Sequence, residues 1–282
     1  MGLVATACGA IMTIAHCLSI AGSDPSGGAG IQADLKTFSA LGTYGMSVLA
    51  GLTAQNTKGV QEICPIPPEF VGAQLHSILD DVRVDVVKIG MLGQAETIRQ
   101  VAKILQQHAD IPIILDPVMN AKSGDDLLLP DAVAVLREEL LPLAHLITPN
   151  LPEASRLTGK DVTNREEMEE AGRALIDKGC QNALIKGGHL DDAKDDLLVT
   201  IHGMSWLQGE IITTKNNHGT GCTLSSAIAA LMAKNMVEHK GQDLRQVVVE
   251  AKYYVTMALA HADQLDVGGG IGPTHHFWDV WL

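Results

Sequence analysis

Short apolar runs recur along the chain, and most are bounded by Gly, Pro, Asp or Asn. They are rich in Val, Ile and Leu, and their shortness favours buried β-strands. The six clearest runs are residues 17–21, 47–52, 86–89, 111–115, 146–148 and 183–186. We therefore expect a sheet that is covered on both faces.

Between these runs, apolar residues recur every three or four positions, which places them on one face of a helix. The clearest such segments are 71–82, 224–232 and 251–262. Strands that alternate with helices predict an α/β fold with a mostly parallel sheet, and such sheets bind ligands at the carboxyl ends of their strands. Segments 197–201 and 210–214 are expected to add an antiparallel pair of strands at one edge.

The composition fits one domain and narrows the range of partners. With 282 residues, of which 46% are apolar, the chain can bury a large core. We expect residues 14–282 to form a single domain and residues 1–13 an N-terminal extension, because the apolar start lacks the positive charge of a signal peptide. A formal charge of −13 argues against nucleic-acid and membrane partners.

The cysteines are odd in number and scattered, and none forms a CxxC pair. This pattern predicts neither a disulfide framework nor a zinc site, and it favours a reducing cytoplasm. The five are Cys8, Cys17, Cys64, Cys180 and Cys222.

The strongest local signal is a glycine-containing segment, Asn216–Leu224, that leads into an amphipathic helix. Gly219 and Gly221 free the backbone to turn its N–H groups inward, and a helix N-terminus carries partial positive charge. The segment is thus a candidate phosphate cradle, or else a tight strand-to-helix turn. Cys222 falls in the first helical turn, where a thiol can have a lowered pKa, although a small core residue is the simpler interpretation.

Oxygen-bearing side chains follow two predicted strands. Asn150 and Glu153 lie three residues apart at a strand end and helix start, so both can face one site. They are candidates for holding Mg²⁺ through water, or for a helix N-cap. Asp116 follows another apolar run and is a second candidate near a metal or phosphates.

Seven motifs, in order and spacing, resemble those of hydroxymethylpyrimidine/phosphomethylpyrimidine kinases of thiamine biosynthesis, which have the ribokinase-like fold. The resemblance runs from about residue 14 to residue 277 and implies a three-layer α/β fold, the use of ATP and Mg²⁺, and a homodimer. The motifs are Ala21–Asp34, Ala54-Gln55-Asn56-Thr57, Lys88–Leu92, Asp116–Met119, Thr148–Ala154, Lys186–His189 and His218–Leu224.

The resemblance also implies roles for individual residues. A pyrimidine pocket is expected from Gly22, Asp24, Gln55, Met91 and Val118. Catalysis is expected from Cys222, Gly221, Gly219 and Lys186, nucleotide and phosphate binding from Asn150, Glu153, Lys186, Thr220 and Lys252, and metal binding from Glu153 and Asp116. The cysteine at position 222 is the pattern of these pyrimidine kinases, whereas ribokinase-like enzymes commonly carry an aspartate base there.

Simpler roles stay open for several of these residues. Gln55 is also typical of an ordinary loop, Met91 of a core, and Asp24 of a turn cap. Asp34, in the following helix, is expected to be a solvated or capping charge. By default Lys186 and Lys252 would be surface lysines.

The expected activity is phosphorylation of 4-amino-5-hydroxymethyl-2-methylpyrimidine by ATP, followed by phosphorylation of the monophosphate. A side-chain amide such as that of Gln55 suits an aminopyrimidine edge, because it donates and accepts together. Pyridoxal kinase is the nearest alternative. A sugar kinase is less favoured, because no inserted lid segment is evident between the first strands, and a non-catalytic ligand-binding protein is a third alternative.

Overall fold

A computed structural model describes residues 13–120, 127–188, 190 and 194–281. The extension predicted for residues 1–13 lies, except for Thr13, outside the described residues. All the strands belong to one nine-stranded sheet with the order β3-β2-β1-β4-β5-β6-β7-β8-β9. The strands are β1 (His16–Gly22), β2 (Tyr44–Asn56), β3 (Gly59–Pro65), β4 (Val86–Ile89), β5 (Ile113–Leu115), β6 (Leu146–Ile147), β7 (Asn182–Ile185), β8 (Asp196–Thr200) and β9 (Gly203–Leu207).

The central strands β2, β1, β4, β5, β6 and β7 are parallel, and antiparallel strands extend both edges. The parallel centre confirms the prediction from the six apolar runs. The antiparallel partner predicted at 210–214 is wrong, because the chain turns at once after β8 and residues 203–207 pair instead. The sequence analysis also missed β3, because this strand is largely exposed and its polar residues resemble those of a loop.

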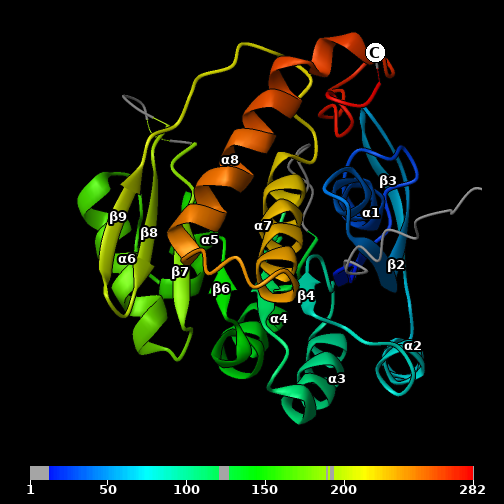
Figure 1. The fold of residues 1–282 in the computed structure, drawn as a ribbon. Helices are drawn as coiled ribbons and strands as arrows, with labels where there is room; N and C mark the ends of the chain where they lie inside the picture. The colour runs from blue at the N-terminus through cyan, green and yellow to red at the C-terminus, as the bar shows by residue number, and fades with distance from the viewer. Residues whose placement is uncertain (1–12, 121–126, 189, 191–193, 282) are drawn as a thin grey trace, which may run out of the picture.

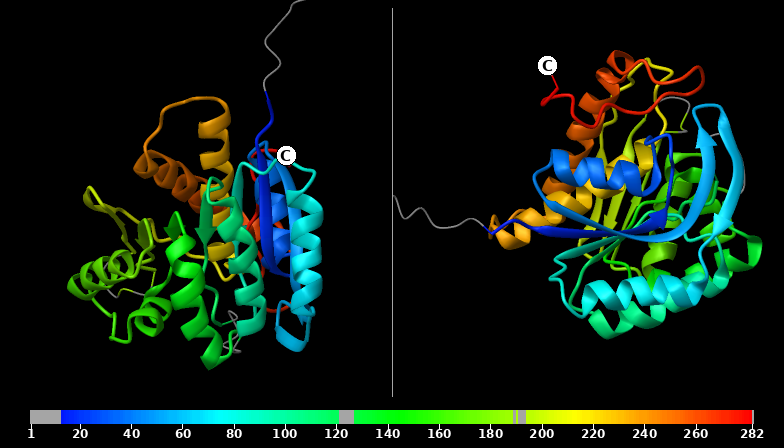
Figure 2. Two further views of the ribbon diagram at one scale, coloured as in Figure 1. Left: turned by 90° about the horizontal axis from the view of Figure 1, so that it is seen from below. Right: turned by 90° about the vertical axis from the view of Figure 1, so that its right-hand side faces the viewer.

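Helices cover both faces of the sheet, as expected (Figure 1, Figure 2). One face packs against α1, α7 and α8, and the other packs against α2 to α6. The α-helices are α1 (Gly30–Ala40), α2 (Pro68–Leu79), α3 (Ala95–Leu105), α4 (Pro130–Val135), α5 (Leu151–Thr158), α6 (Arg165–Asp177), α7 (Thr220–Val237) and α8 (Leu244–Ala260). Short 3₁₀ or π turns cover Gln106–His108, Leu136–Leu140, Leu141–Leu143 and Ala262–Gln264.

Alternation along the strands explains the three layers. Ile113 and Leu115 of β5 join the core beneath α2 to α6, whereas Ile114 joins the core beneath α1, α7 and α8. Because successive side chains of a strand point to opposite faces, a continuous apolar run must be buried on both. The predicted three-layer arrangement is therefore confirmed.

The strand order changes direction at β1, which lies between β2 and β4. In open parallel sheets, ligands bind beyond the carboxyl ends of the strands at such a point. The residues just after β1, β4 and β5 are thus placed to line a site. Within the described residues, no helix combines the length and apolar character needed to cross a membrane.

Candidate active site

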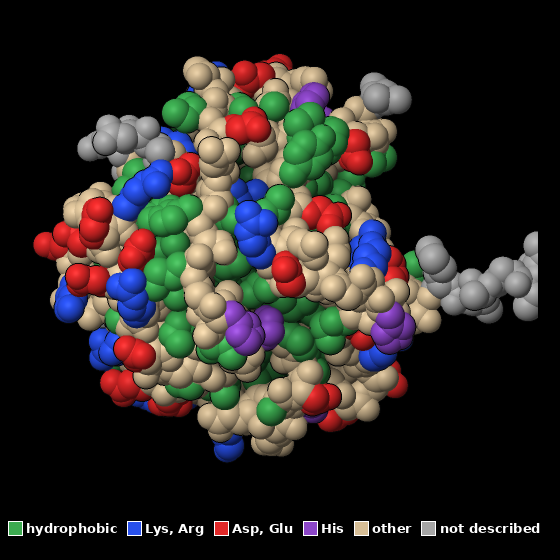
Figure 3. Space-filling model, turned by 60° about the vertical axis from the view of Figure 1, so that its left-hand side comes forward, with side chains coloured by type: hydrophobic (Ala, Val, Ile, Leu, Met, Phe, Trp, Pro, Cys, Tyr) green, Lys and Arg blue, Asp and Glu red, His purple; other side chains and the backbone are tan. Residues whose placement is uncertain are grey.

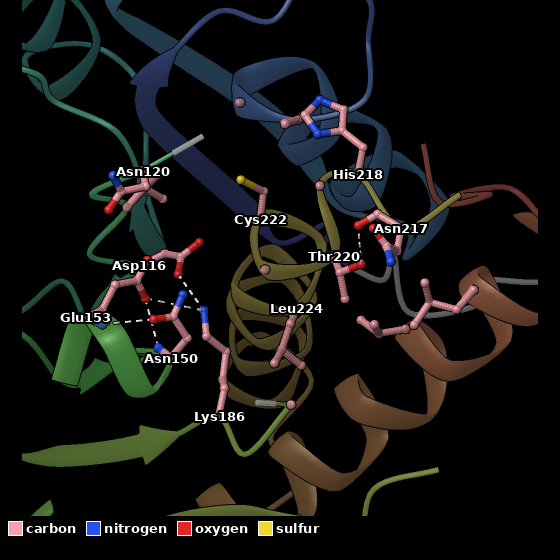
Figure 4. Close-up of a pocket in the computed structure, with 18 of the residues that line it drawn as sticks. Asp116, Asn120, Asn150, Glu153, Lys186, Asn217, His218, Thr220, Cys222 and Leu224 are labelled. Carbon is pink, nitrogen blue, oxygen red and sulfur yellow. Dashed lines mark hydrogen bonds and ion pairs between the residues drawn. The ribbon is translucent and has the colours of Figure 1, made fainter. Parts of the chain in front are cut away.

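A cavity of about 840 Å³ lies at the carboxyl ends of the parallel strands. Every predicted site residue lines it, from Gly22 at the end of β1 to Lys252 on α8. The glycine-containing segment before α7 forms one of its walls (Figure 4). The tertiary structure thus brings the sequence candidates together at the edge of the sheet where they were expected.

The start of α7 has the geometry of an anion-binding turn. Gly219 is the residue before the helix and has φ +79°, and a Cβ there would collide with the carbonyl oxygen of Gly28. The Thr220 hydroxyl donates a hydrogen bond of 2.7 Å to the carbonyl of Asn217, which closes the turn. The first N–H groups of a helix have no intrahelical partners, so this end of α7 offers donors to a phosphate.

Gly221 has a different role from the one expected. It lies within α7 and has no positive φ, so it is not needed for backbone freedom. A Cβ at this position would lie 3.3 Å from the Lys186 ammonium and 3.7 Å from the Asp116 carboxylate. Glycine therefore leaves space beside these two charged groups, where a ligand can approach them.

Cys222 follows in the first turn of α7, at the open end of the helix in Figure 4. Burial raises the pKa of its thiol to about 11, although Lys88 opposes the rise. The lowered pKa suggested by the helix N-terminus is wrong, because desolvation of the thiolate outweighs the opposing effect of Lys88. The group is therefore a neutral thiol near pH 7 and a poor general base.

Replacing Cys222 with alanine is expected to lower kcat by about tenfold while leaving the KM for the pyrimidine within about twofold. The thiol lines the cavity in the first turn of α7, beside the anion-binding turn, so its loss should affect the phosphoryl group more than the ring. Steady-state kinetics of Cys222→Ala and Cys64→Ala, which alters an exposed cysteine of β3, test this expectation. A wild-type kcat in Cys222→Ala would refute a catalytic role for the thiol.

Opposite the helix end, two carboxylates share one lysine (Figure 4). The Nζ atom of Lys186, just after β7, lies 3.1 Å from Asp116 Oδ1 and 4.0 Å from Glu153 Oε2. Although burial opposes it, Lys186 holds the pKa of Asp116 below its ordinary value. Burial raises the pKa of Glu153 to about 7, against the opposing effect of Lys186. Lys186 thus keeps negative charge at the site neutralised.

Asn150 and Glu153 form a capping box at the start of α5. The Asn150 side chain accepts a 2.9 Å hydrogen bond from the Glu153 N–H, and the Glu153 carboxylate accepts a 2.8 Å bond from the Asn150 N–H. The simpler interpretation of this pair, a helix cap, is confirmed. Because Glu153 also faces Lys186 within the cavity, capping fixes this carboxylate at the site.

The donor chemistry fits Mg²⁺ held mainly through phosphates and water. Asp116 and Glu153 supply hard carboxylate oxygens beside the anion-binding turn, and Mg²⁺ commonly takes one or two carboxylates together with substrate phosphates. Among the described residues, no cluster of three or more His, Cys, Asp or Glu side chains could form a metal cage. Asp116 and Glu153 are therefore candidates for an ion that arrives with its nucleotide.

In the predicted ring pocket, the backbone at two glycines approaches the side chain of Met91. A Cβ at Gly22 would collide with the terminal methyl of Met91, and a Cβ at Gly51 would lie 3.5 Å from that methyl. Gln55 lies nearby on β2, where its Oε1 accepts a 3.1 Å hydrogen bond from the Thr53 hydroxyl. Val118 lines the same cavity, so these side chains offer an apolar slot with an amide at its edge.

Asp24 stabilises the turn between β1 and α1. Its carboxylate accepts hydrogen bonds from the Ser26 hydroxyl at 2.6 Å and from the Ala29 N–H at 2.8 Å. Although burial acts to raise the pKa of Asp24, the hydrogen bonds from His218 and Ser26 hold it below the ordinary value. The turn-cap interpretation is confirmed, while contact with a substrate stays a prediction.

His218 is a site residue that the sequence analysis did not identify. Its Nε2 lies 2.7 Å from Asp24 Oδ2 and 3.4 Å from Gln55 Nε2, and the next residue is Gly219 (Figure 4). The histidine therefore connects the ring pocket to the anion-binding turn. Its position directly before the two glycines was the only signal available in the sequence.

Lys252 lines the cavity from α8 and forms an ion pair with Asp196, whose other oxygen accepts a 2.8 Å hydrogen bond from the Gly187 N–H. This pairing fixes the ammonium group, so Lys252 is not a free surface lysine. The cavity wall beside Lys252 is apolar and suits the flat face of a nucleotide base. It contains Ile211, Ile212, Leu224, Val255 and Leu259.

Solved structures with the same fold define the class of protein. The ADP complex of Bacillus subtilis pyridoxal kinase superposes with a TM-score of 0.84 at 37% identity, covering 94% of this chain and 98% of that chain. Phosphomethylpyrimidine kinase from Clostridium difficile gives a TM-score of 0.77 at 41% identity, covering 88% of this chain and all of that chain. The fold is that of a ribokinase-like small-molecule kinase.

The sequence comparisons resolve the family within this class. The model of a family described as phosphomethylpyrimidine kinase matches residues 24–275. Hydroxymethylpyrimidine/phosphomethylpyrimidine kinase of Escherichia coli is 53% identical over 268 residues, covering 94% of this chain and 98% of the relative. The chain belongs to the phosphomethylpyrimidine kinase family. The resemblance found in the motifs is thereby confirmed.

Proposed function

We propose that this protein transfers the γ-phosphoryl group of ATP to 4-amino-5-hydroxymethyl-2-methylpyrimidine, and then to the resulting monophosphate, in thiamine biosynthesis. The observation that carries the proposal is one cavity in which the predicted ring pocket adjoins an anion-binding helix end. The family membership and the 53% identical relative support the same activity. Gly22 and Met91 line this cavity and pack against each other, which supports a flat ring as the acceptor.

In the reaction, the hydroxymethyl oxygen of the pyrimidine attacks the γ-phosphorus, and the bond to the β–γ bridging oxygen breaks to release ADP. The N–H groups at the start of α7 and the Lys186 ammonium stabilise charge on the equatorial oxygens. Asp116 and Glu153 would hold Mg²⁺, which would supply positive charge beside the phosphates of the nucleotide. Gly221 leaves space for the phosphates beside Lys186.

A strong general base is not required by this arrangement. Cys222 is protonated near neutral pH, because burial raises its pKa to about 11. Phosphoryl transfer passes through a loose transition state, in which the attacking hydroxyl gains little acidity before the phosphorus–oxygen bond breaks. The proton can leave to solvent or to a phosphate oxygen after transfer, so positioning and charge neutralisation provide the catalysis.

The test is a product analysis with three acceptors, namely the hydroxymethylpyrimidine, its monophosphate and pyridoxal. With excess Mg-ATP, the hydroxymethylpyrimidine is expected to be converted to the diphosphate, with two ADP released per pyrimidine. Pyridoxal is included because a pyridoxal kinase superposes with a TM-score of 0.84. A reaction that stops at the monophosphate, or that prefers pyridoxal, would contradict the proposed two-step activity.

Gln55→Leu is expected to raise the KM for the pyrimidine by about tenfold, because an unpaired ring polar group costs roughly 1–3 kcal/mol. The KM for ATP should change by less than twofold, since Gln55 faces the ring pocket and not the nucleotide side. Gln61→Leu, in an exposed position on β3, is the matched control. Equal increases in both KM values would indicate a folding defect instead.

We further propose that residues 14–282 act as one domain, in the cytoplasm, and as a homodimer. Acidic and basic side chains are interspersed among the described residues of the face in Figure 3, which supports small-molecule partners over nucleic acid. The four described cysteines are free thiols, as in a reducing compartment. Sedimentation analysis of the purified protein tests the proposed homodimer.

A further inference from the structure

A buried ion pair lies beneath the anion-binding turn and has no part in the reaction described above. Lys88 of β4 and Asp34 of α1 are both fully buried, and Lys88 Nζ lies 2.9 Å from each oxygen of the Asp34 carboxylate. The sequence expectation that Asp34 is a solvated or capping charge is wrong. Taking both charges out of water is costly, so the pair calls for a specific explanation.

The Asp34 carboxylate connects four elements. Besides the lysine of β4, it accepts a 2.6 Å hydrogen bond from Ser19 of β1 on Oδ2 and another of 2.6 Å from Ser226 of α7 on Oδ1. Ser226 lies one helical turn after Cys222. The ends of β1 and β4 lead into the predicted ring pocket, and the start of α7 forms the anion-binding turn. The Asp34 carboxylate, itself on α1, joins β1, β4 and α7.

The ion pair is also oriented. Lys88, though fully buried, is among the residues around the cavity whereas Asp34 is not, so the ammonium lies on the side of the pair nearer the site. Lys88 influences the pKa of Cys222 more strongly than Asp34 does, and it also helps to hold the pKa of Asp116 low. A Cβ at Gly90 would lie 2.9 Å from Lys88 Nζ, so the glycine after β4 leaves space for the ammonium.

We propose that Lys88 and Asp34 are positioning residues for phosphoryl transfer. They join the first turns of α7 to β1 and β4, and they hold a fixed positive charge beneath the anion-binding turn. The pair is buried and acts through the turn. Its loss should therefore reduce kcat and not substrate binding. This inference rests on the proposed kinase activity.

The decisive variant is Lys88→Met/Asp34→Asn, which removes both charges and leaves no unpaired ion. Each single change, Lys88→Met or Asp34→Asn, leaves one buried charge without its partner and is expected to lower the melting temperature by several degrees. The double variant should recover most of that loss. Its kcat is nevertheless expected to stay at least about tenfold below wild type, with both KM values within about threefold.

Ser226→Ala keeps the ion pair and removes only the link to α7, so it decides the matter if the double variant does not fold. We expect a kcat about three- to tenfold lower and unchanged KM values. The matched control is Thr37→Ala, which removes another fully buried hydroxyl, one that bonds the Ala33 carbonyl of its own helix. The control should retain the wild-type kcat.

Two results would overturn the proposal: a folded double variant with kcat within twofold of wild type, or a Ser226→Ala protein with the same kcat as Thr37→Ala. The first would leave the pair as a stabiliser of the fold alone. Wild-type protein is assayed in parallel with the hydroxymethylpyrimidine. Absence of turnover there would refute the proposed function, whereas loss in the variants alone concerns the ion pair.

Discussion

Replacing Lys186 with methionine is expected to lower kcat by about 10²–10³-fold. The Lys186 ammonium is the group that neutralises both Asp116 and Glu153, and Gly221 leaves space for a phosphoryl group beside it. Without the lysine, the transferring phosphoryl group loses the ammonium that stabilises its charge and lies beside two acidic side chains. The loss should be larger with the monophosphate as acceptor, because that substrate brings an additional dianion to the same place, and added salt should narrow the difference.

The same variant should also change the pH dependence of kcat. Burial raises the pKa of Glu153 to about 7, and Lys186 opposes this rise. Removing the lysine therefore raises the pKa of Glu153 further and also that of Asp116, so the acidic limb of the profile should move to higher pH. Stopped assays across pH 5–9 and thermal melts measure these effects. An exposed lysine, Lys160, gives the control Lys160→Met.

A kcat of Lys186→Met within threefold of wild type would contradict the role of Lys186 in catalysis. A lower melting temperature with no shift of the acidic limb would show that the lysine only stabilises the fold. Because the control removes a lysine that pairs with Glu170 on the surface, it separates the loss of charge at the site from the loss of charge in general.

The second large effect is expected for Gly219→Ala, with kcat lower by about 10²-fold. The alanine Cβ would collide with the Gly28 carbonyl oxygen, so the turn must move away from the β1–α1 segment. Displacement by about 1 Å of groups that position a reacting phosphoryl group is sufficient for such a loss. The positive φ of +79° adds strain to the collision.

Gly159→Ala is the matched control, because Gly159 has φ +77° but no atom within 4 Å of a Cβ. It shares the backbone strain of about 1–2 kcal/mol without the collision. We expect Gly159→Ala to lose stability and keep its kcat, while Gly219→Ala loses both. Equal kcat values for the two variants, measured with hydroxymethylpyrimidine and Mg-ATP, would refute the importance of the turn position.

Some features of the structure could be predicted from short sequence patterns, and others could not. The spacing of Asn150 and Glu153 was sufficient to predict a helix cap, because a capping box depends on residues three apart. The glycine-containing segment was sufficient to predict the turn that leads into α7, whereas phosphate binding at this turn stays a prediction. The strand predicted at residues 210–214, by contrast, is wrong, because the tight turn after β8 pairs residues 203–207 with that strand instead. Strand partners at an edge depend on the neighbouring strand and not on the segment alone.

The sequence by itself determined the alternation of strands and helices, the parallel centre of the sheet and the motifs of the family, because each is encoded in adjacent residues. Only the tertiary structure decided the pairing of Asp34 with Lys88, the contact of His218 with Asp24 and the protonated state of Cys222. These properties depend on burial and on charges far apart in the chain. Asp34 is 54 residues from Lys88, and His218 is 194 residues from Asp24. A pKa or an ion pair is set by the solvent that folding removes and by the partners that folding brings near.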